Sequence, residues 1–159
     1  MSDEQRPITV QGFEALRAEV ERLIKEERPK VIAAIAEARG HGDLSENAEY
    51  DAAKNEQALL EKKISQMQSN IANSQIIDIS DIKEDKIVFG ATVTIQNTET
   101  DEKRIFQIVG EDEADLKKGK ISIKAPIAKA LIGKRIEDEV IVSAPGGEIE
   151  YVIINFKYL

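Results

Sequence analysis

The sequence of 159 residues contains no cysteine and no tryptophan, and its single histidine is His41. The absence of cysteine excludes disulfide bonds, thiolate metal ligands and cysteine nucleophiles, and it fits a reducing compartment. No apolar stretch approaches the ~20 residues that a membrane-spanning helix needs. The first residues also lack the basic segment and apolar run of a secretion signal. These features predict a cytoplasmic protein with no contact with a membrane.

An excess of positive charge is missing as well. The formal net charge is −8, because the chain has 22 basic residues and 30 acidic ones. Residues 1–80 hold 10 basic and 15 acidic residues, and residues 81–159 hold 12 and 15, so both halves are acidic. Proteins that bind DNA or RNA non-specifically normally present a basic surface. Any contact with nucleic acid is therefore expected to be local or to depend on a protein partner.

The first third of the chain has the periodicity of a long helix. Apolar residues recur at intervals of three and four from Phe13 to Ala38, which is the spacing of one helix face. Pro29 interrupts this stripe, and the stripe shifts by one residue across it. Proline removes a backbone donor and disturbs the preceding turn. We therefore expect a local irregularity of the helix at Pro29.

A second helical stripe follows a glycine-rich break at residues 40–42. It runs from Tyr50 to Ser74 with alternating intervals of three and four, which is heptad spacing. Two helical runs of similar length around a short turn predict an antiparallel helical hairpin with coiled-coil packing over residues 1–79. Near the turn the seam is rich in alanine, which keeps that end of the hairpin thin.

The second half changes from helical to strand periodicity. Residues 80–159 are predicted to form a compact antiparallel β domain with one short helix, so the fold class is α+β. Pro126 and Gly133 bracket the expected helix, in the positions where proline begins and glycine ends helices. The acidic stretch 78–86 is the expected linker. The expected strands cover residues 87–95, 103–109, 120–124, 140–142 and 149–156.

Two carboxylates lie at the turn of the hairpin. Asp43 and Glu46 are three residues apart at the expected start of the second helix, so both can face one side. One interpretation is structural, with Asp43 as the N-cap and Glu46 completing a capping box. The other is a shared pair of ligands for Mg²⁺, which one or two carboxylates often hold together with substrate phosphates. Spacing alone favours capping, and the two interpretations are compatible.

The run Gly42-Asp43-Leu44-Ser45-Glu46-Asn47-Ala48-Glu49-Tyr50 resembles the signature of the bacterial Gre transcript-cleavage factors. The second half is similar to the same family at Phe89-Gly90-Ala91-Thr92-Val93 and at Pro145-Gly146-Gly147. The likeness covers nearly the whole chain, from about residue 8 to Leu159. The acidic balance and the few basic residues near the turn resemble the GreA branch more than GreB.

This resemblance implies a transcription elongation factor and not an independent enzyme. The family inserts its coiled coil into the secondary channel of RNA polymerase and stimulates cleavage of backtracked RNA, which rescues arrested complexes. By the resemblance, Asp43 and Glu46 would help to hold a Mg²⁺ that belongs mainly to the polymerase. Arg39 and Lys54 would contact the 3′ end of the nascent RNA.

The resemblance also implies a partner surface on the second half. An FKBP-like domain over residues 80–159 would dock on the polymerase, with Pro126 and Ile127 in the docking loop. Ala125 departs from the serine that is usual before this proline. The protein is expected to act as a monomer.

Three other functions remain open from the sequence. An FKBP-like domain could isomerise proline peptides, although the second half has only five aromatic residues to line a pocket. The protein could occupy the polymerase channel without promoting cleavage, but the presence of both Asp43 and Glu46 favours cleavage. A structural helical adaptor is the last alternative, and it would make the identity of the turn residues unimportant. The five aromatic residues of the second half are Phe89, Phe106, Tyr151, Phe156 and Tyr158.

Overall fold

The computed structural model describes residues 5–40 and 47–159. Its contacts form two compact units, one of residues 14–73 and one that joins the N-terminal residues up to Phe13 with residues 74–159. We call them the hairpin unit and the sheet unit. The N-terminal residues group with the second half because β1 (Arg6–Thr9) pairs in parallel with β2 (Ser74–Ile77), with Ile8 opposite Ile76. This pairing was not predicted, and the predicted division between the domains lay between residues 79 and 80.

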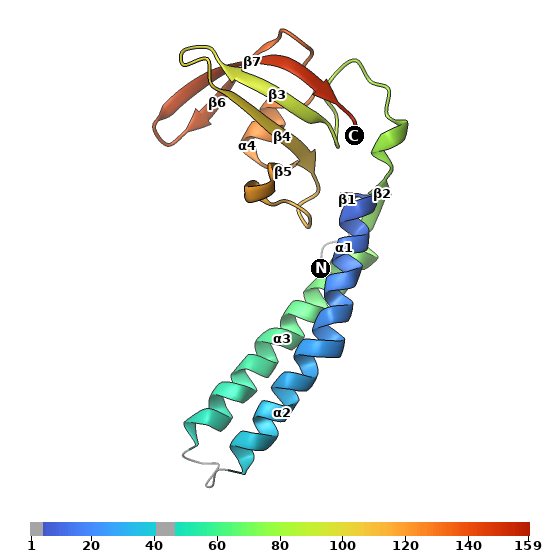
Figure 1. Ribbon diagram of the computed structural model, residues 1–159, viewed down its shortest axis with the longest axis vertical. Coiled ribbons are helices and arrows are strands. Elements are labelled where there is room, and N and C mark those ends of the chain that lie inside the picture. Colours follow the sequence, from blue (N-terminus) through green and yellow to red (C-terminus); the bar gives the residue numbers. More distant parts are fainter. Residues whose placement is uncertain (1–4, 41–46) are drawn as a thin grey trace. The chain divides into compact units, whose positions relative to one another are not determined.

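The hairpin unit has two long antiparallel arms (Figure 1), as the periodicity predicted. The first arm runs through α1 (Val10–Arg22), the π-helical segment η1 (Leu23–Glu27) and α2 (Arg28–Arg39), and the second arm is α3 (Ala48–Ala72). Small and medium apolar side chains fill the seam between α2 and α3. The buried members are Val31, Ile35 and Ala53, with Ala34, Tyr50 and Leu60 packed against them.

The segment η1 is the local irregularity expected at Pro29. The backbone N–H of Arg28 donates to the carbonyl of Leu23, five residues earlier, which is the bond of a π-helical turn. Pro29 has no N–H and its ring crowds the preceding turn, so a wider turn there costs less. A π-helical turn contains one extra residue, and this accounts for the one-residue shift of the apolar stripe. The expectation is confirmed.

Helix α3 ends earlier than its apolar stripe. The last helical residue is Ala72, Asn73 is the C-cap, and Ser74 already belongs to β2. The stripe therefore predicted the end of the helix two residues too late. Pairing with β1 provides backbone hydrogen bonds from Ser74 onward, and the extended conformation replaces the last part of the helical run.

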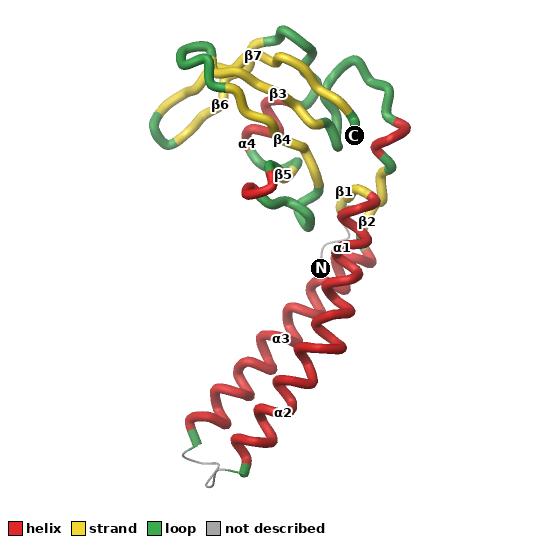
Figure 2. Tube along the Cα trace, viewed as in Figure 1, coloured by secondary structure: helices red, strands yellow, loops and turns green. Residues whose placement is uncertain are grey.

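The sheet unit contains a curled five-stranded sheet in the order β5-β4-β3-β7-β6 (Figure 2). Three of its four pairings are antiparallel, and the pairing of β4 with β5 is parallel. Helix α4 (Pro126–Leu131) buries Ala128 and Leu131 completely in the core of the sheet. Two short 3-10 turns are η3 (Ile79–Asp81) and η4 (Leu116–Lys118). The strands are β3 (Thr92–Asn97), β4 (Lys103–Val109), β5 (Lys120–Ser122), β6 (Glu139–Ala144) and β7 (Gly147–Lys157).

The first predicted strand of the sheet unit is shorter than expected. It was predicted from Ile87, but β3 begins at Thr92. Gly90 has a φ of 92°, which side chains other than glycine rarely adopt, and this conformation interrupts the extended run. Ile87 is still fully buried, with its N–H bonded to the carbonyl of Lys134 beyond α4. The apolar pattern therefore identified core residues correctly but joined a loop to the strand.

Among the helices of residues 5–40 and 47–159, none is both long enough and apolar enough to cross a bilayer.

Candidate functional site at the end of the helical hairpin

The structure places four of the six residues singled out from the sequence. Asp43 and Glu46 lie outside the described residues. Arg39 is the last residue of α2, and Lys54 lies in the second turn of α3; both are exposed. Pro126 and Ile127 begin α4 in the other unit. The basic pair at the end of the hairpin is thus carried by two different arms.

The N-cap of α3 is Asn47 and not Asp43, so the structural interpretation of Asp43 is wrong for this helix. The side-chain oxygen of Asn47 accepts a hydrogen bond from the N–H of Tyr50 at 3.1 Å. Glu49 and Asp51 follow in the first turn, where negative charge complements the helix dipole. An asparagine followed by acidic residues is an ordinary start signal for a helix, but Asn47 was not predicted as the cap.

The same side chain also joins the two arms. The amide nitrogen of Asn47 donates to the carbonyl of Ala38, in the last turn of α2, at 2.5 Å. One amide therefore binds both an N–H at the start of α3 and a C=O at the end of α2. Helix ends leave such groups without partners inside the helix. Asparagine suits this position because its side chain carries both an acceptor and a donor.

Arg39 lies over the aromatic ring of Tyr50. The guanidinium carbon is 5.7 Å from the ring centroid, within the range of a cation–π contact. The guanidinium, as a hydrogen-bond donor and as a nearby positive charge, lowers the pKa of the Tyr50 phenol. Tyr50 begins the apolar stripe predicted for the second helix, and its ring packs in the seam. Its contact with the basic residue was not predicted.

Lys54 has a looser environment than Arg39. Its ammonium donates to the side-chain oxygen of Gln57 at 3.3 Å, on the exposed surface of α3. Tyr50 and Lys54 are four residues apart and therefore share a face of the helix. Another face of the hairpin is acidic: a shallow groove there is lined by alanines and carboxylates, namely Ala34, Glu37, Ala38, Glu49, Ala52, Ala53 and Glu56.

The described residues contain no cluster of three or more histidine, aspartate or glutamate side chains arranged to hold a metal ion. Asp43 and Glu46 supply the hard oxygen donors that Mg²⁺ prefers, but two carboxylates leave most of an octahedral shell unfilled. Their chemistry fits a shared site in which other groups provide the remaining ligands.

The start of α4 is the predicted docking loop. Ala125 occupies the N-cap position and makes no capping bond with its side chain, as expected for alanine. Pro126 is exposed, whereas Ile127 is partly buried against the core of the sheet unit. Of the two, Pro126 is therefore the residue that a partner can reach more fully.

The aromatic residues of the sheet unit serve its packing. Tyr151 is 6% exposed and Phe89 is 8% exposed. Phe106 and Phe156 pack against the core, as does Tyr158, whose hydroxyl accepts from the N–H of Val88 at 3.0 Å and donates to the carbonyl of Lys86 at 2.9 Å. An isomerase pocket lined by aromatics would need these rings, and the fold already uses them.

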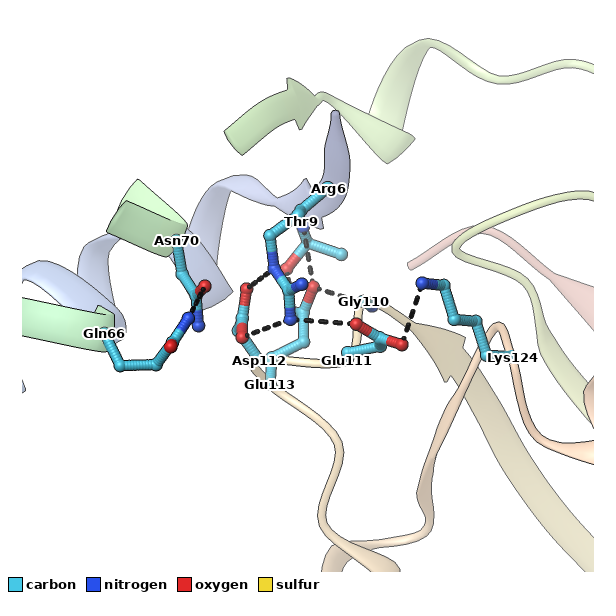
Figure 3. Close-up of polar contacts among 9 residues, drawn as sticks. All are labelled: Arg6, Thr9, Gln66, Asn70, Gly110, Glu111, Asp112, Glu113 and Lys124. Atoms are coloured by element: carbon cyan, nitrogen blue, oxygen red, sulfur yellow. Dashed lines mark hydrogen bonds and ion pairs between the residues drawn. The ribbon is translucent and has the colours of Figure 1, made fainter. Parts of the chain in front are cut away.

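A second polar centre, within the sheet unit, was not predicted (Figure 3). The carboxylate of Glu113 accepts from the N–H of Thr9 at 2.8 Å, from the Thr9 hydroxyl at 2.5 Å and from the N–H of Gly110 at 3.1 Å. Arg6 forms two hydrogen bonds of 2.9 Å with Asp112. These bonds hold the N-terminal strand β1 on the loop after β4. The run of acidic residues after Gly110 was the only sequence signal for this centre.

Comparisons with known proteins agree over both units. Residues 6–76 match the family model for the N-terminal part of a transcription elongation factor, and residues 82–158 match the one for the C-terminal part of GreA/GreB. The chain is 55% identical over 152 residues to the transcription elongation factor GreA of Trichlorobacter lovleyi and 54% identical over 152 residues to that of Pelobacter propionicus. Each of these matches covers 96% of both chains.

Solved structures with similar chains were also found. GreA factor homolog 1 of Thermus thermophilus is 24% identical, with a TM-score of 0.45 over 97% of this chain and 99% of that one. A GreA/GreB factor from Nitrosomonas europaea is 19% identical, with a TM-score of 0.44 over 97% of this chain and 100% of that one.

Proposed function

The chain belongs to the GreA/GreB family of transcription elongation factors, and from this membership we propose that it reactivates arrested RNA polymerase by stimulating cleavage of backtracked RNA. The hairpin unit enters the secondary channel of the polymerase, and the sheet unit docks outside it. The cleavage reaction takes place in the active site of the polymerase, and this protein contributes groups to that site. Its partners are RNA polymerase and the 3′ end of the nascent RNA.

The observation that carries this proposal is the cap of α3. Because Asn47 caps the helix, Asp43 and Glu46 are not needed for that structural task. Two carboxylates at the turn of a hairpin with a thin, alanine-rich seam are well suited to reach a narrow site. Hydrolysis with two metal ions uses one ion at the leaving oxygen and another to position the attacking water. Asp43 and Glu46 would serve as ligands of the ion that positions the attacking water.

Basic and docking residues have separate tasks in this proposal. Arg39 and Lys54 bring positive charge to an otherwise acidic chain, close to where the backtracked RNA would lie. They neutralise phosphate charge locally, which contributes to binding without a broad basic surface. The exposed Pro126 and the neighbouring Ile127 contribute to docking of the sheet unit.

The test uses stalled, backtracked polymerase with Mg²⁺ and measures the release of short 3′ RNA fragments. The Asp43→Asn variant should release them at least about 10- to 100-fold more slowly, since even loss of a group that supports a ligand costs that much. Its helix content should be unchanged. Glu37→Gln, in the acidic groove, is the matched control and should behave like the parent.

Two results would contradict the proposal. If the parent binds polymerase and releases no fragments, the protein is a channel-occupying regulator. If Asp43→Asn and Glu46→Gln together leave cleavage unchanged, the carboxylates are not ligands.

A further inference from the structure

Arg39 is an exposed arginine whose orientation is nevertheless restricted. Among residues 5–40 and 47–159, its side chain interacts with one other, that of Tyr50, at 5.7 Å from guanidinium carbon to ring centroid. The contact crosses from α2 to α3, so it is absent from either helix alone. A free arginine side chain loses conformational entropy when it is immobilised. A side chain that already rests on a ring loses less when it binds a ligand.

The ring of Tyr50 is itself held in place. It packs against the buried seam residues Val31, Ile35 and Ala53. Its backbone N–H is bonded to the Asn47 side chain, and the same amide is bonded to the carbonyl of Ala38, next to Arg39. The Asn47 side chain therefore links the backbone of Tyr50 to the backbone beside Arg39. This link and the packing of the ring in the seam place the ring close to the end of α2.

We propose that Tyr50 is a positioning residue for Arg39, whose guanidinium it holds in place at the end of the hairpin to bind a phosphate of the backtracked RNA. The inference rests on the proposed function for its ligand, and on the contact between the two side chains for its mechanism. A guanidinium that rests on a ring face can still direct N–H groups from its edge toward a phosphate. Two parallel N–H bonds to one phosphate are the strong form of this contact.

Tyr50 adds no charge, so its contribution should depend wholly on Arg39. A role in the seam alone would instead affect the protein whatever residue stands at position 39. This difference separates the proposal from ordinary packing. A cation–π contact at an exposed site is worth ~0.5–1 kcal/mol, which corresponds to about a two- to fivefold effect.

The first experiment measures the contact without polymerase. The tyrosine ring carbons are labelled with ¹³C, and Tyr50 is titrated by NMR in the parent and in Arg39→Gln. The pKa of the Tyr50 phenol should rise when the guanidinium is removed, while that of Tyr158 stays as it is in the parent. An unchanged Tyr50 titration would overturn the proposed contact.

The second experiment is a double-mutant cycle in the fragment-release assay with saturating protein. Tyr50→Leu should slow cleavage about two- to fivefold, whereas Tyr50→Phe, which keeps the ring, should retain most of the rate. In the Arg39→Gln background, Tyr50→Leu should cause no further loss. Helix content by circular dichroism shows whether each variant keeps the hairpin.

The outcomes distinguish the positioning role of Tyr50 from the proposed function of the protein. Equal losses from Tyr50→Leu in both backgrounds would mean that the ring acts through the seam, and the positioning role would be rejected. If Tyr50→Phe retained no more activity than Tyr50→Leu, the positioning role would be rejected as well. A parent protein that binds polymerase and releases no fragments would overturn the proposed function and the phosphate role, while the NMR titration would still decide the contact.

Discussion

Glu113 accepts two hydrogen bonds from Thr9, although 104 residues separate them in the chain. Thr9 is the last residue of β1, its side chain is buried, and its hydroxyl also accepts from the N–H of Gly12 in the first turn of α1. One carboxylate thus satisfies donors at the junction between a strand and a helix. The bonds make the N-terminal segment part of the sheet unit, which explains the grouping of the two compact units.

Removal of the Glu113 carboxylate should destabilise the sheet unit. Glu113→Ala leaves the buried N–H groups of Thr9 and Gly110 without their acceptor, at ~1–3 kcal/mol for each unsatisfied group. We expect a loss of about 2–4 kcal/mol in the free energy of unfolding, measured in urea. Glu111→Ala is the matched control, because Glu111 forms only partly exposed ion pairs with Arg6 and Lys124, and it should cost about 1 kcal/mol or less. Equal losses in the two variants would refute the role of Glu113.

A methyl group at position 110 should also be harmful. A Cβ on Gly110 would collide with the backbone carbonyl oxygen of Pro7, and backbone cannot swing away as a flexible side chain can. Gly110→Ala should therefore lower stability by about 1–3 kcal/mol, seen as a lower thermal midpoint. Gly146→Ala has open space around the new Cβ and should be nearly neutral. A neutral Gly110→Ala would show that the N-terminal strand does not approach this loop so closely.

Asn47 offers a way to separate capping from the link between the arms. Asn47→Asp keeps an acceptor for the N–H of Tyr50 but cannot donate to the carbonyl of Ala38, whereas Asn47→Ala loses both bonds. Loss of the cap costs ~1 kcal/mol, so Asn47→Ala should be the less stable variant. Both should show faster amide exchange near the end of α2 than the parent. Parent-like exchange in Asn47→Asp would mean that the bond to Ala38 contributes nothing.

The pH dependence of one carboxylate pair has a defined sign. Glu139 and Glu150 lie on neighbouring strands β6 and β7, and the hydrogen bond and the charge of Glu139 raise the pKa of Glu150. A carboxyl group whose pKa is raised on folding stabilises the fold at low pH, and that stabilisation is lost as the pH rises through the folded pKa. Glu139→Gln should therefore raise the thermal midpoint slightly at pH 7 but not at pH 3. Glu148→Gln is the control, and a gain of equal size at both pH values would contradict the assignment.

Much of the hairpin unit was readable from the sequence because its contacts are local. Residues three and four apart define the buried face of a helix, so the spacing of Val31 and Ile35 in the sequence predicts that they lie on this face. The same logic located the π-helical turn, since an extra residue shifts the stripe by one. Strands β4 and β7 were predicted for a similar reason, since apolar and polar residues alternate along a strand.

Other features could not be read because they depend on residues distant in sequence. The pairing of β1 with β2 and the bonds of Thr9 to Glu113 join segments more than 60 residues apart. The contact of Arg39 with Tyr50 depends on how two helices lie side by side. The cap at Asn47 could have been predicted from the sequence, but Asp43, three residues before Glu46, was considered as the cap instead.

The class of fold, the two helical arms, the family and the residues that the family would use follow from the order of the amino acids, because periodicity and a contiguous signature are properties of neighbouring residues. The cap of α3, the ring that supports Arg39 and the strand that pairs with β1 were known only once the folded structure was seen. Those choices depend on hydrogen bonds and packing between distant parts of the chain, and these form only when the whole chain has folded.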